Sequence, residues 1–157
     1  MLMGIHPAIG PDLLAILCRM GHGDSLVLAD AHFPAASCHP QVLRADAISI
    51  ETLLEGILPL FPLDCYVDAP LAMMAAVPGD RLDPGVEEAY RVVIGRHAAR
   101  GGFERPIVIE RVERFAFYER AKRAFAIVQS GSTATYGNII IQKGVVPVAP
   151  EYRRESL

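Results

Sequence analysis

Short apolar stretches of strand type alternate along this chain with longer segments that have helical spacing. The strand-like stretches are residues 25–30, 71–77, 106–112, 124–128 and 138–142. The helix-like segments are residues 12–20, 49–61, 83–97 and 115–123. Short strands that are apolar throughout belong to a sheet that helices bury on both faces. The alternation therefore predicts an α/β fold, with helices packed on a central, mostly parallel or mixed sheet.

Residues that start or stop helices support these boundaries. Pro11 stands at the start of the first helix, and Gly21 follows its end. Ser49 is a candidate N-cap for the second helix, whose last turn is disfavoured by Pro59. Residues 31–41 contain two prolines and predict a loop. The pattern leaves open whether the last two strands pair as a hairpin or lie beside other strands.

Composition narrows the class of protein. The chain has 157 residues, 52% of them hydrophobic and 21% charged, which indicates one globular domain. A net charge of −3 argues against binding to nucleic acid or to an anionic membrane. The mean hydropathy of +0.28 is high for a small monomer and predicts that other subunits cover apolar surface.

Location is predicted from the N-terminus, the apolar runs and the cysteines. The first residues lack the basic region of a secretory leader, and no apolar run is long enough to cross a bilayer. Cys18, Cys38 and Cys65 are odd in number and widely spaced, which is typical of a reducing cytoplasm. A cytoplasmic protein is the expectation.

Groups that transfer protons near neutral pH flank the first predicted strand. His22 lies between two glycines before the strand, and Asp30 and His32 follow it. Ligands bind at strand ends in α/β sheets, which favours a site at Asp30. Two alternatives stay open. In the first, His22 only interacts with the last carbonyls of a helix. In the second, the Asp30 side chain only satisfies the amides of its own turn.

Several kinds of chemistry lack their signatures. Asp30, His32, Cys38 and His39 match no standard spacing of metal ligands, so no metal site is predicted. The chain has no phosphate-binding loop, no dinucleotide-binding glycine motif after the first strand and no nucleophile elbow. Nucleotide and esterase chemistry are therefore not supported.

Two later clusters suit a polyhydroxylated ligand. The segment from Arg114 to Arg120 combines guanidinium groups with Phe117 and Tyr118, which can face the apolar surface of a sugar. The alternative is an amphipathic helix with its phenylalanines in the core. The turn Tyr136-Gly137-Asn138 supplies a hydroxyl and an amide around a flexible glycine, or is only a turn before a strand.

Taken together, these segments resemble the L-fucose mutarotase family, within the wider group of ribose pyranases and fucose mutarotases. The resemblance rests on Gly21-His22-Gly23-Asp24, Ala29-Asp30-Ala31-His32-Phe33-Pro34-Ala35, Arg44-Ala45-Asp46, Met73-Met74-Ala75-Ala76-Val77, Arg114-Phe115-Ala116-Phe117-Tyr118-Glu119-Arg120-Ala121 and Tyr136-Gly137-Asn138. These segments occur in order over most of the chain. The Arg-Phe-Ala-Phe-Tyr run is closer to the fucose branch than to the ribose branch.

The resemblance implies a ribose pyranase-like fold, a decameric ring and exchange between the α and β anomers of L-fucose without a cofactor. It gives His22 the role of acid and base. It assigns sugar binding to Asp30, Arg114 and the Tyr136-Gly137-Asn138 turn, with Tyr118 as a further candidate. The domain would then be residues 1–147, followed by a C-terminal tail over residues 148–157.

Geometry adds a prediction about the site. A five-residue strand spans about 17 Å at ~3.3 Å per residue, and His22 and Asp30 flank such a strand. They meet one sugar only if the turn at residues 21–24 folds back or if a neighbouring subunit supplies one of them. We expect a site at a subunit interface. Two other functions stay open: exchange between ribose pyranose and furanose, and a non-catalytic sugar-binding oligomer that assists transport.

Overall fold

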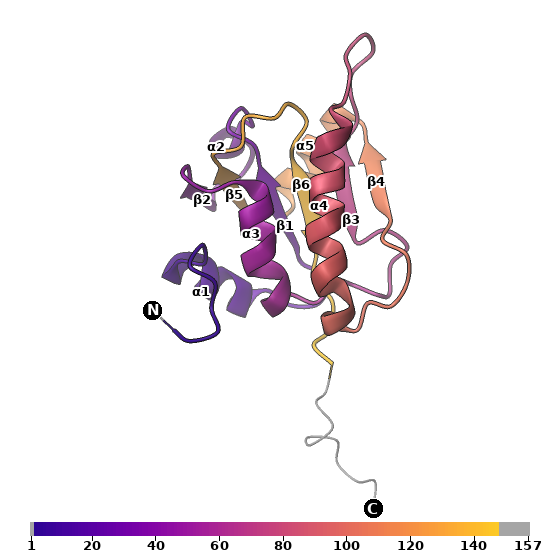
Figure 1. Cartoon of the computed structure of the whole chain (residues 1–157). Coiled ribbons are helices and arrows are strands. Elements are labelled where there is room, and N and C mark those ends of the chain that lie inside the picture. The colour runs from indigo at the N-terminus through magenta and orange to yellow at the C-terminus, as the bar shows by residue number, and fades with distance from the viewer. Residues whose placement is uncertain (1, 148–157) are drawn as a thin grey trace, which may run out of the picture.

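The structure, a computed structural model, describes residues 2–147. Within them, six strands form one mixed sheet (Figure 1). The strands are β1 (Ser25–Ala29), β2 (Val42–Ala45), β3 (Leu71–Met74), β4 (Ile109–Val112), β5 (Ala126–Ser130) and β6 (Ile139–Gln142). Their order is β2-β5-β1-β6-β3-β4, with β6 antiparallel to both of its neighbours and every other pair parallel. The predicted α/β class is confirmed, and β5 and β6 flank β1 instead of forming a hairpin.

Helices cover both faces of the sheet (Figure 1). They are α1 (Pro11–Arg19), α2 (Ala35–Cys38), α3 (Ile50–Ile57), α4 (Pro84–His97) and α5 (Arg114–Lys122), with 3₁₀ turns at Leu58–Leu60 and Ala98–Gly101. Side chains alternate across a strand, so Leu26 and Leu28 of β1 pack with the core under α1, α3 and α4. Val27 and Ala29 pack with the smaller core under α2 and α5. Burial on both faces explains why the strands are apolar throughout.

Several boundaries differ from those predicted. The Ser49 cap is confirmed, since its Oγ accepts the Thr52 N–H at 3.2 Å, but α3 ends at Ile57 because the following Pro59 lies in a 3₁₀ turn. The strands β3 and β4 are shorter than predicted, and β5 ends two residues later. The predicted loop over residues 31–41 contains α2. The edge strand β2 that follows was missed because it is half-buried and carries Arg44.

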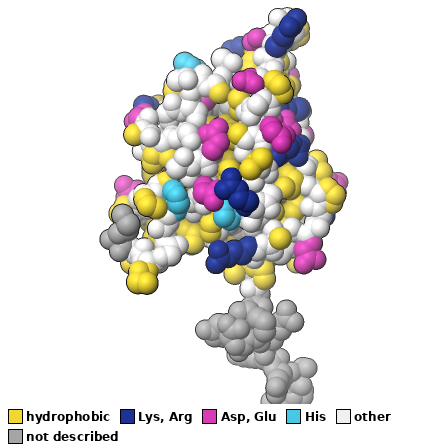
Figure 2. Space-filling view, in the orientation of Figure 1, with side chains coloured by type: hydrophobic (Ala, Val, Ile, Leu, Met, Phe, Trp, Pro, Cys, Tyr) yellow, Lys and Arg dark blue, Asp and Glu magenta, His cyan; other side chains and the backbone are white. Residues whose placement is uncertain are grey.

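The surface over α3 and α4 mixes charges of both signs with apolar side chains (Figure 2). Glu55 of α3 binds Arg96 and His97 of α4 there, at 3.2 and 2.9 Å, and so ties the two helices together. No helix among residues 2–147 is both long and apolar enough to span a membrane. The predicted tail, residues 148–157, lies outside the described residues.

Candidate active site

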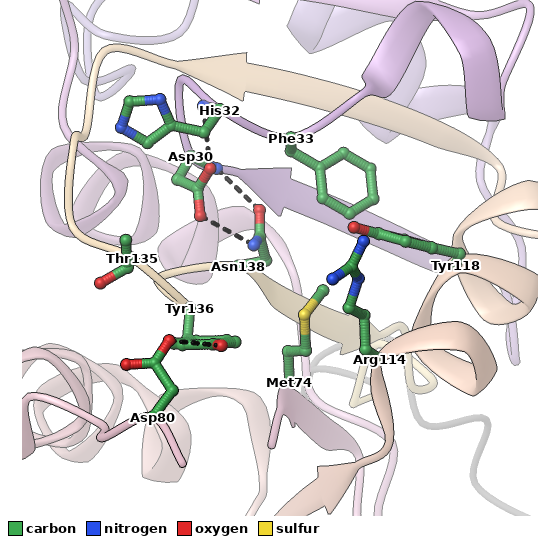
Figure 3. A pocket seen from close by; sticks show the side chains of 10 residues that line it. All are labelled: Asp30, His32, Phe33, Met74, Asp80, Arg114, Tyr118, Thr135, Tyr136 and Asn138. Atoms are coloured by element: carbon green, nitrogen blue, oxygen red, sulfur yellow. Dashed lines mark hydrogen bonds between the residues drawn. The ribbon is translucent and has the colours of Figure 1, made fainter. Parts of the chain in front are cut away.

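A cavity of about 280 Å³ opens at the carboxyl end of the parallel strands. Its walls come from the segments that follow β1, β3 and β4 and from the turn that precedes the antiparallel β6 (Figure 3). The lining residues are Asp30, His32, Phe33, Met74, Asp80, Arg114, Tyr118, Thr135, Tyr136 and Asn138. This is the edge of an α/β sheet at which ligands bind. Five of the predicted site residues, Asp30, Arg114, Tyr118, Tyr136 and Asn138, are brought together here.

A buried pair forms the floor of the cavity. The side-chain Nδ2 of Asn138 donates to Asp30 Oδ2 at 2.8 Å, and its Oδ1 accepts the Asp30 backbone N–H at 2.9 Å (Figure 3). Asp30 Oδ1 also accepts the His32 N–H at 3.0 Å, so the Asp30 side chain does satisfy an amide of its own turn. Asp30 is 3% exposed, and burial raises the pKa of its carboxyl. A carboxylate beside an open cavity has lone pairs that can accept hydrogen bonds from a ligand.

Aromatic side chains and a guanidinium form one wall. The rings of Phe33 and Tyr118 meet edge to face, with centroids 5.5 Å apart. The Arg114 guanidinium lies over the Tyr118 ring at 5.7 Å, at the start of α5, where Glu113 caps the helix. This guanidinium points into the cavity (Figure 3), and no carboxylate within residues 2–147 forms an ion pair with it. This wall offers a ligand both an apolar surface and strong hydrogen-bond donors.

The turn before β6 forms the facing wall. Tyr136 has a backbone φ of 60°, the left-handed conformation that residues other than glycine rarely adopt. Its hydroxyl donates to Asp80 Oδ2 at 2.7 Å. Gly137 does not line the cavity: it is buried, its carbonyl accepts the Tyr90 hydroxyl at 2.8 Å, and a Cβ there would lie 2.9 Å from the Ala134 carbonyl oxygen. Gly137 therefore shapes the turn that carries Tyr136 and Asn138.

His22 lies at the opposite end of β1. Its Nε2 is 3.2 Å from Asp64 Oδ1, and its ring stands 5.4 Å from the ring of Tyr66. Asp64 is 1% exposed, and its other oxygen accepts the Gln142 amide at 3.1 Å. Because Ser25 pairs with Gln142 and Leu28 with Ile139, the strands β1 and β6 separate the His22 end from the Asp30 end. Within one subunit the turn at residues 21–24 does not fold back to the cavity.

Some groups at the two ends were missed by sequence reasoning. Asp64 follows an apolar run, which was a usable signal for a buried carboxylate. Asp80 lies just beyond the strand predicted over residues 71–77, and the sequence pattern assigned it no role. His39, considered beside Asp30 for a metal site, instead contacts the Gln41 backbone. Residues 2–147 contain no group of three His, Cys, Asp or Glu side chains placed to hold a metal ion.

Comparison with known proteins identifies the family. The model of the RbsD / FucU transport protein family matches residues 3–146. The chain belongs to this family. RbsD / FucU relatives include the L-fucose mutarotase of Actinobacillus pleuropneumoniae serotype 5b, which is 62% identical over 94% of this chain and 99% of its own. The L-fucose mutarotase of Histophilus somni strain 2336 is 61% identical over 94% of this chain and 99% of its own. The resemblance to the L-fucose mutarotase family is thereby confirmed.

Solved structures of the RbsD / FucU family show the same fold. The fucose mutarotase of Streptococcus pneumoniae, solved in complex with L-fucose, superposes with a TM-score of 0.84 at 45% identity and covers 93% of this chain and 100% of its own. RbsD of Bacillus subtilis, solved in complex with D-ribose, has a TM-score of 0.66 at 18% identity over 88% of this chain and 95% of its own. The second likeness shows a shared fold alone.

Proposed function

We propose that this protein is a mutarotase that interconverts the α and β anomers of L-fucose. The observation that carries this proposal is the cavity, in which the polar groups of Asp30 and Asn138 face a wall that combines the Arg114 guanidinium with the apolar side chains of Phe33 and Met74 (Figure 3). A 6-deoxy sugar has the matching surface, with hydroxyls on one part and a methyl group on another. Relatives named L-fucose mutarotases, at 59–62% identity, support the same substrate.

The chemistry needs only proton transfers. The C1 hydroxyl loses its proton, the ring oxygen gains one, and the bond between C1 and the ring oxygen breaks to give the open-chain aldehyde. Rotation about C1–C2 and closure, with the two transfers reversed, give the other anomer. One imidazole can accept the first proton and supply the second, which is worth about 10²–10⁴-fold in rate. This sequence of steps requires no cofactor.

In this proposal His22 is the general acid and base. Asp64 supports that role, because a carboxylate beside Nε2 holds the ring in place and stabilises the imidazolium that forms when the ring takes up a proton. Asp30, Arg114, Tyr118, Tyr136 and Asn138 would bind the sugar, as the resemblance implies, and Gly137 would shape their turn.

The separation of His22 from the cavity supports a site shared between subunits. His22 has 48% of its side chain exposed and Tyr66 is 74% exposed, so both can contact a sugar held by a neighbouring copy of the chain. We propose a homo-oligomer, a decamer by family resemblance, in which one subunit brings His22 to the cavity of the next. Three free cysteines support a location in the reducing cytoplasm.

The test is magnetisation transfer between the α and β anomeric protons of L-fucose, with wild-type protein, His22→Ala and the control His39→Ala. His39 lies outside both ends of the site, so its variant should match wild type. Accelerated exchange that is lost only in His22→Ala supports the mutarotase. Faster exchange of ribose than of fucose would indicate a ribose pyranase. Binding of L-fucose without accelerated exchange would indicate an accessory sugar-binding protein.

A further inference from the structure

Asp80 binds Tyr136 in one wall of the cavity. Neither the sequence patterns nor the family resemblance pointed to this carboxylate. Asp80 lies in the turn that leads into α4, and its Oδ2 accepts the hydroxyl hydrogen of Tyr136 at 2.7 Å (Figure 3). This is the short distance of a hydrogen bond from a hydroxyl to an ionised carboxylate. Both side chains line the cavity.

The turn that carries Asp80 is itself fixed. Gly79 has a φ of 92°, and the Asp80 N–H donates to the Val77 carbonyl at 3.0 Å. Asp80 Oδ1 accepts the Arg81 N–H at 2.8 Å, so the carboxylate is held at one oxygen and presents the other to Tyr136. Three residues later Asp83 caps α4. Asp80 is therefore anchored by local backbone contacts before it meets Tyr136.

The same helix and its leading turn hold the Tyr136 segment at two points. Asp80 binds the Tyr136 side chain, and Tyr90 of α4 donates to the carbonyl of Gly137. Tyr136 also keeps the left-handed backbone that costs energy for any residue with a Cβ. Such a conformation persists where surrounding contacts determine it, and here those contacts come from residues 77–90.

The geometry fixes the direction of hydrogen bonding at Tyr136. A phenol has one hydrogen and otherwise only acceptor capacity. That hydrogen is directed at Asp80, and the hydrogen bond raises the pKa of Tyr136 and lowers the pKa of Asp80. At neutral pH the proton therefore stays on the phenol and the charge on the carboxylate. The phenol oxygen also accepts a long hydrogen bond from the Val77 N–H at 3.4 Å, which leaves its second lone pair for a ligand in the cavity.

We propose that Asp80 is a positioning residue that turns the hydroxyl hydrogen of Tyr136 away from the substrate, so that Tyr136 accepts a hydrogen bond from a sugar hydroxyl. Tyr136 then acts as a hydrogen-bond acceptor for the sugar and does not supply the proton for the ring oxygen. This inference rests on the proposed function and goes beyond it, because it assigns a role to a residue outside the predicted site.

The experiment compares Asp80→Asn, Tyr136→Phe and the double variant with the control Asp83→Asn. The control removes the same charge three residues away, and asparagine still caps a helix. Exchange of L-fucose gives KM and kcat, and tyrosine labelled with ¹³C at Cζ gives the pKa of Tyr136. An asparagine at position 80 has one oxygen for two donors, and with that oxygen on the Arg81 N–H its amide nitrogen donates to Tyr136 and takes up the acceptor site. We expect Asp80→Asn and Tyr136→Phe each to raise KM by about 5- to 20-fold with little change in kcat, since each loses one hydrogen bond of uniform binding.

Two further results separate positioning from mere support of the turn. The double variant should be no worse than the more affected single variant, because both changes remove one interaction. In Asp80→Asn the pKa of Tyr136 should fall toward its ordinary value, while in Asp83→Asn it stays. An unchanged KM in Tyr136→Phe, additive losses or an unmoved pKa would overturn the inference.

The failure of the proposed function is distinguishable from these outcomes. Wild-type protein that does not accelerate exchange contradicts the mutarotase. In that case the Tyr136 Cζ resonance, followed while L-fucose is added, decides the inference. A shift that is lost in Asp80→Asn supports it, and no shift overturns it.

Discussion

The two ends of β6 carry the same chemical pair in different surroundings. At one end the amide of Asn138 donates to Asp30, and at the other the amide of Gln142 donates to Asp64. Both carboxylates are almost fully buried, at 3% and 1% exposed. The Asp30 pair faces a cavity with an aromatic wall, whereas the Asp64 pair faces the half-exposed ring of His22.

Under the proposed function, this difference would separate sugar binding at one end of the strand from proton transfer at the other. The Asp30 end has walls, a floor and a free guanidinium, so it can hold a polyhydroxylated ligand without help. The Asp64 end has an imidazole that is 48% exposed, with a buried carboxylate behind it. Each end lacks what the other has, and the juxtaposition of two subunits is the simplest way to combine them.

The largest expected effect comes from combining damaged subunits. His22→Ala should lose about 10²–10⁴-fold of the exchange rate, and Arg114→Ala at least about 30-fold of kcat/KM. When the two variants are dissociated and reassembled together, about a quarter of the shared sites should hold both intact groups, by random association. Exchange of L-fucose should then return to about a quarter of the wild-type value.

The control for this mixture is each variant reassembled with itself, which should stay inactive. Recovery to about a quarter would show that the two ends of β6 cooperate across an interface. If mixtures show no more activity than the sum of their parts, each subunit works alone and the comparison between the two ends is broken.

A smaller effect distinguishes the two amides. Asn138→Ala removes the partner of the Asp30 carboxylate and the acceptor of its backbone N–H, so it should destabilise the fold by about 1–3 kcal/mol. Gln142→Ala removes one hydrogen bond, to Asp64 Oδ2, and leaves His22 and the Tyr66 N–H on Oδ1, so it should cost less than Asn138→Ala, about 1 kcal/mol. Urea unfolding of both variants measures the difference. Equal losses would show that the two pairs do the same structural work.

Sequence patterns were sufficient for the central elements of the fold and insufficient for its edges. The strand at residues 25–30 was predicted because burial on both faces leaves an apolar run. The start of α4 at Asp83-Pro84 was predicted because a helix cap also leaves a local signal. The strand β2 was missed, since an edge strand with Arg44 in it has neither pattern. The pairing of β6 with β1 depends on contacts between residues more than 100 apart, which no local pattern contains.

The candidate site shows the same limit. Asp30 and Asn138 were recognised separately, and nothing in their sequence neighbourhoods indicated that they form one buried pair. Asp64 and Asp80 were missed because a lone aspartate in a turn is usually explained by local amides. Their roles follow from the tertiary contacts with His22 and Tyr136.

The smallest expected effect is a pH dependence that belongs to the Asp30 end. Burial raises the pKa of Asp30 in the folded protein above its value of about 3.8 in the unfolded chain. The folded state therefore binds more protons than the unfolded state just above that pH. Since stability falls with pH where the folded state holds the extra proton, ionisation of Asp30 destabilises wild-type protein as pH rises through this window.

Asp30→Asn cannot ionise, so the difference in unfolding free energy, wild type minus variant, should decrease between about pH 4 and pH 7. Urea unfolding at several pH values, with Asp12→Asn as an exposed control of the same charge change, measures it. If the difference in unfolding free energy is constant with pH, the cavity solvates the Asp30 carboxylate as well as water does. The proposed contrast between a binding end at Asp30 and a proton-transfer end at Asp64 would then have no electrostatic basis.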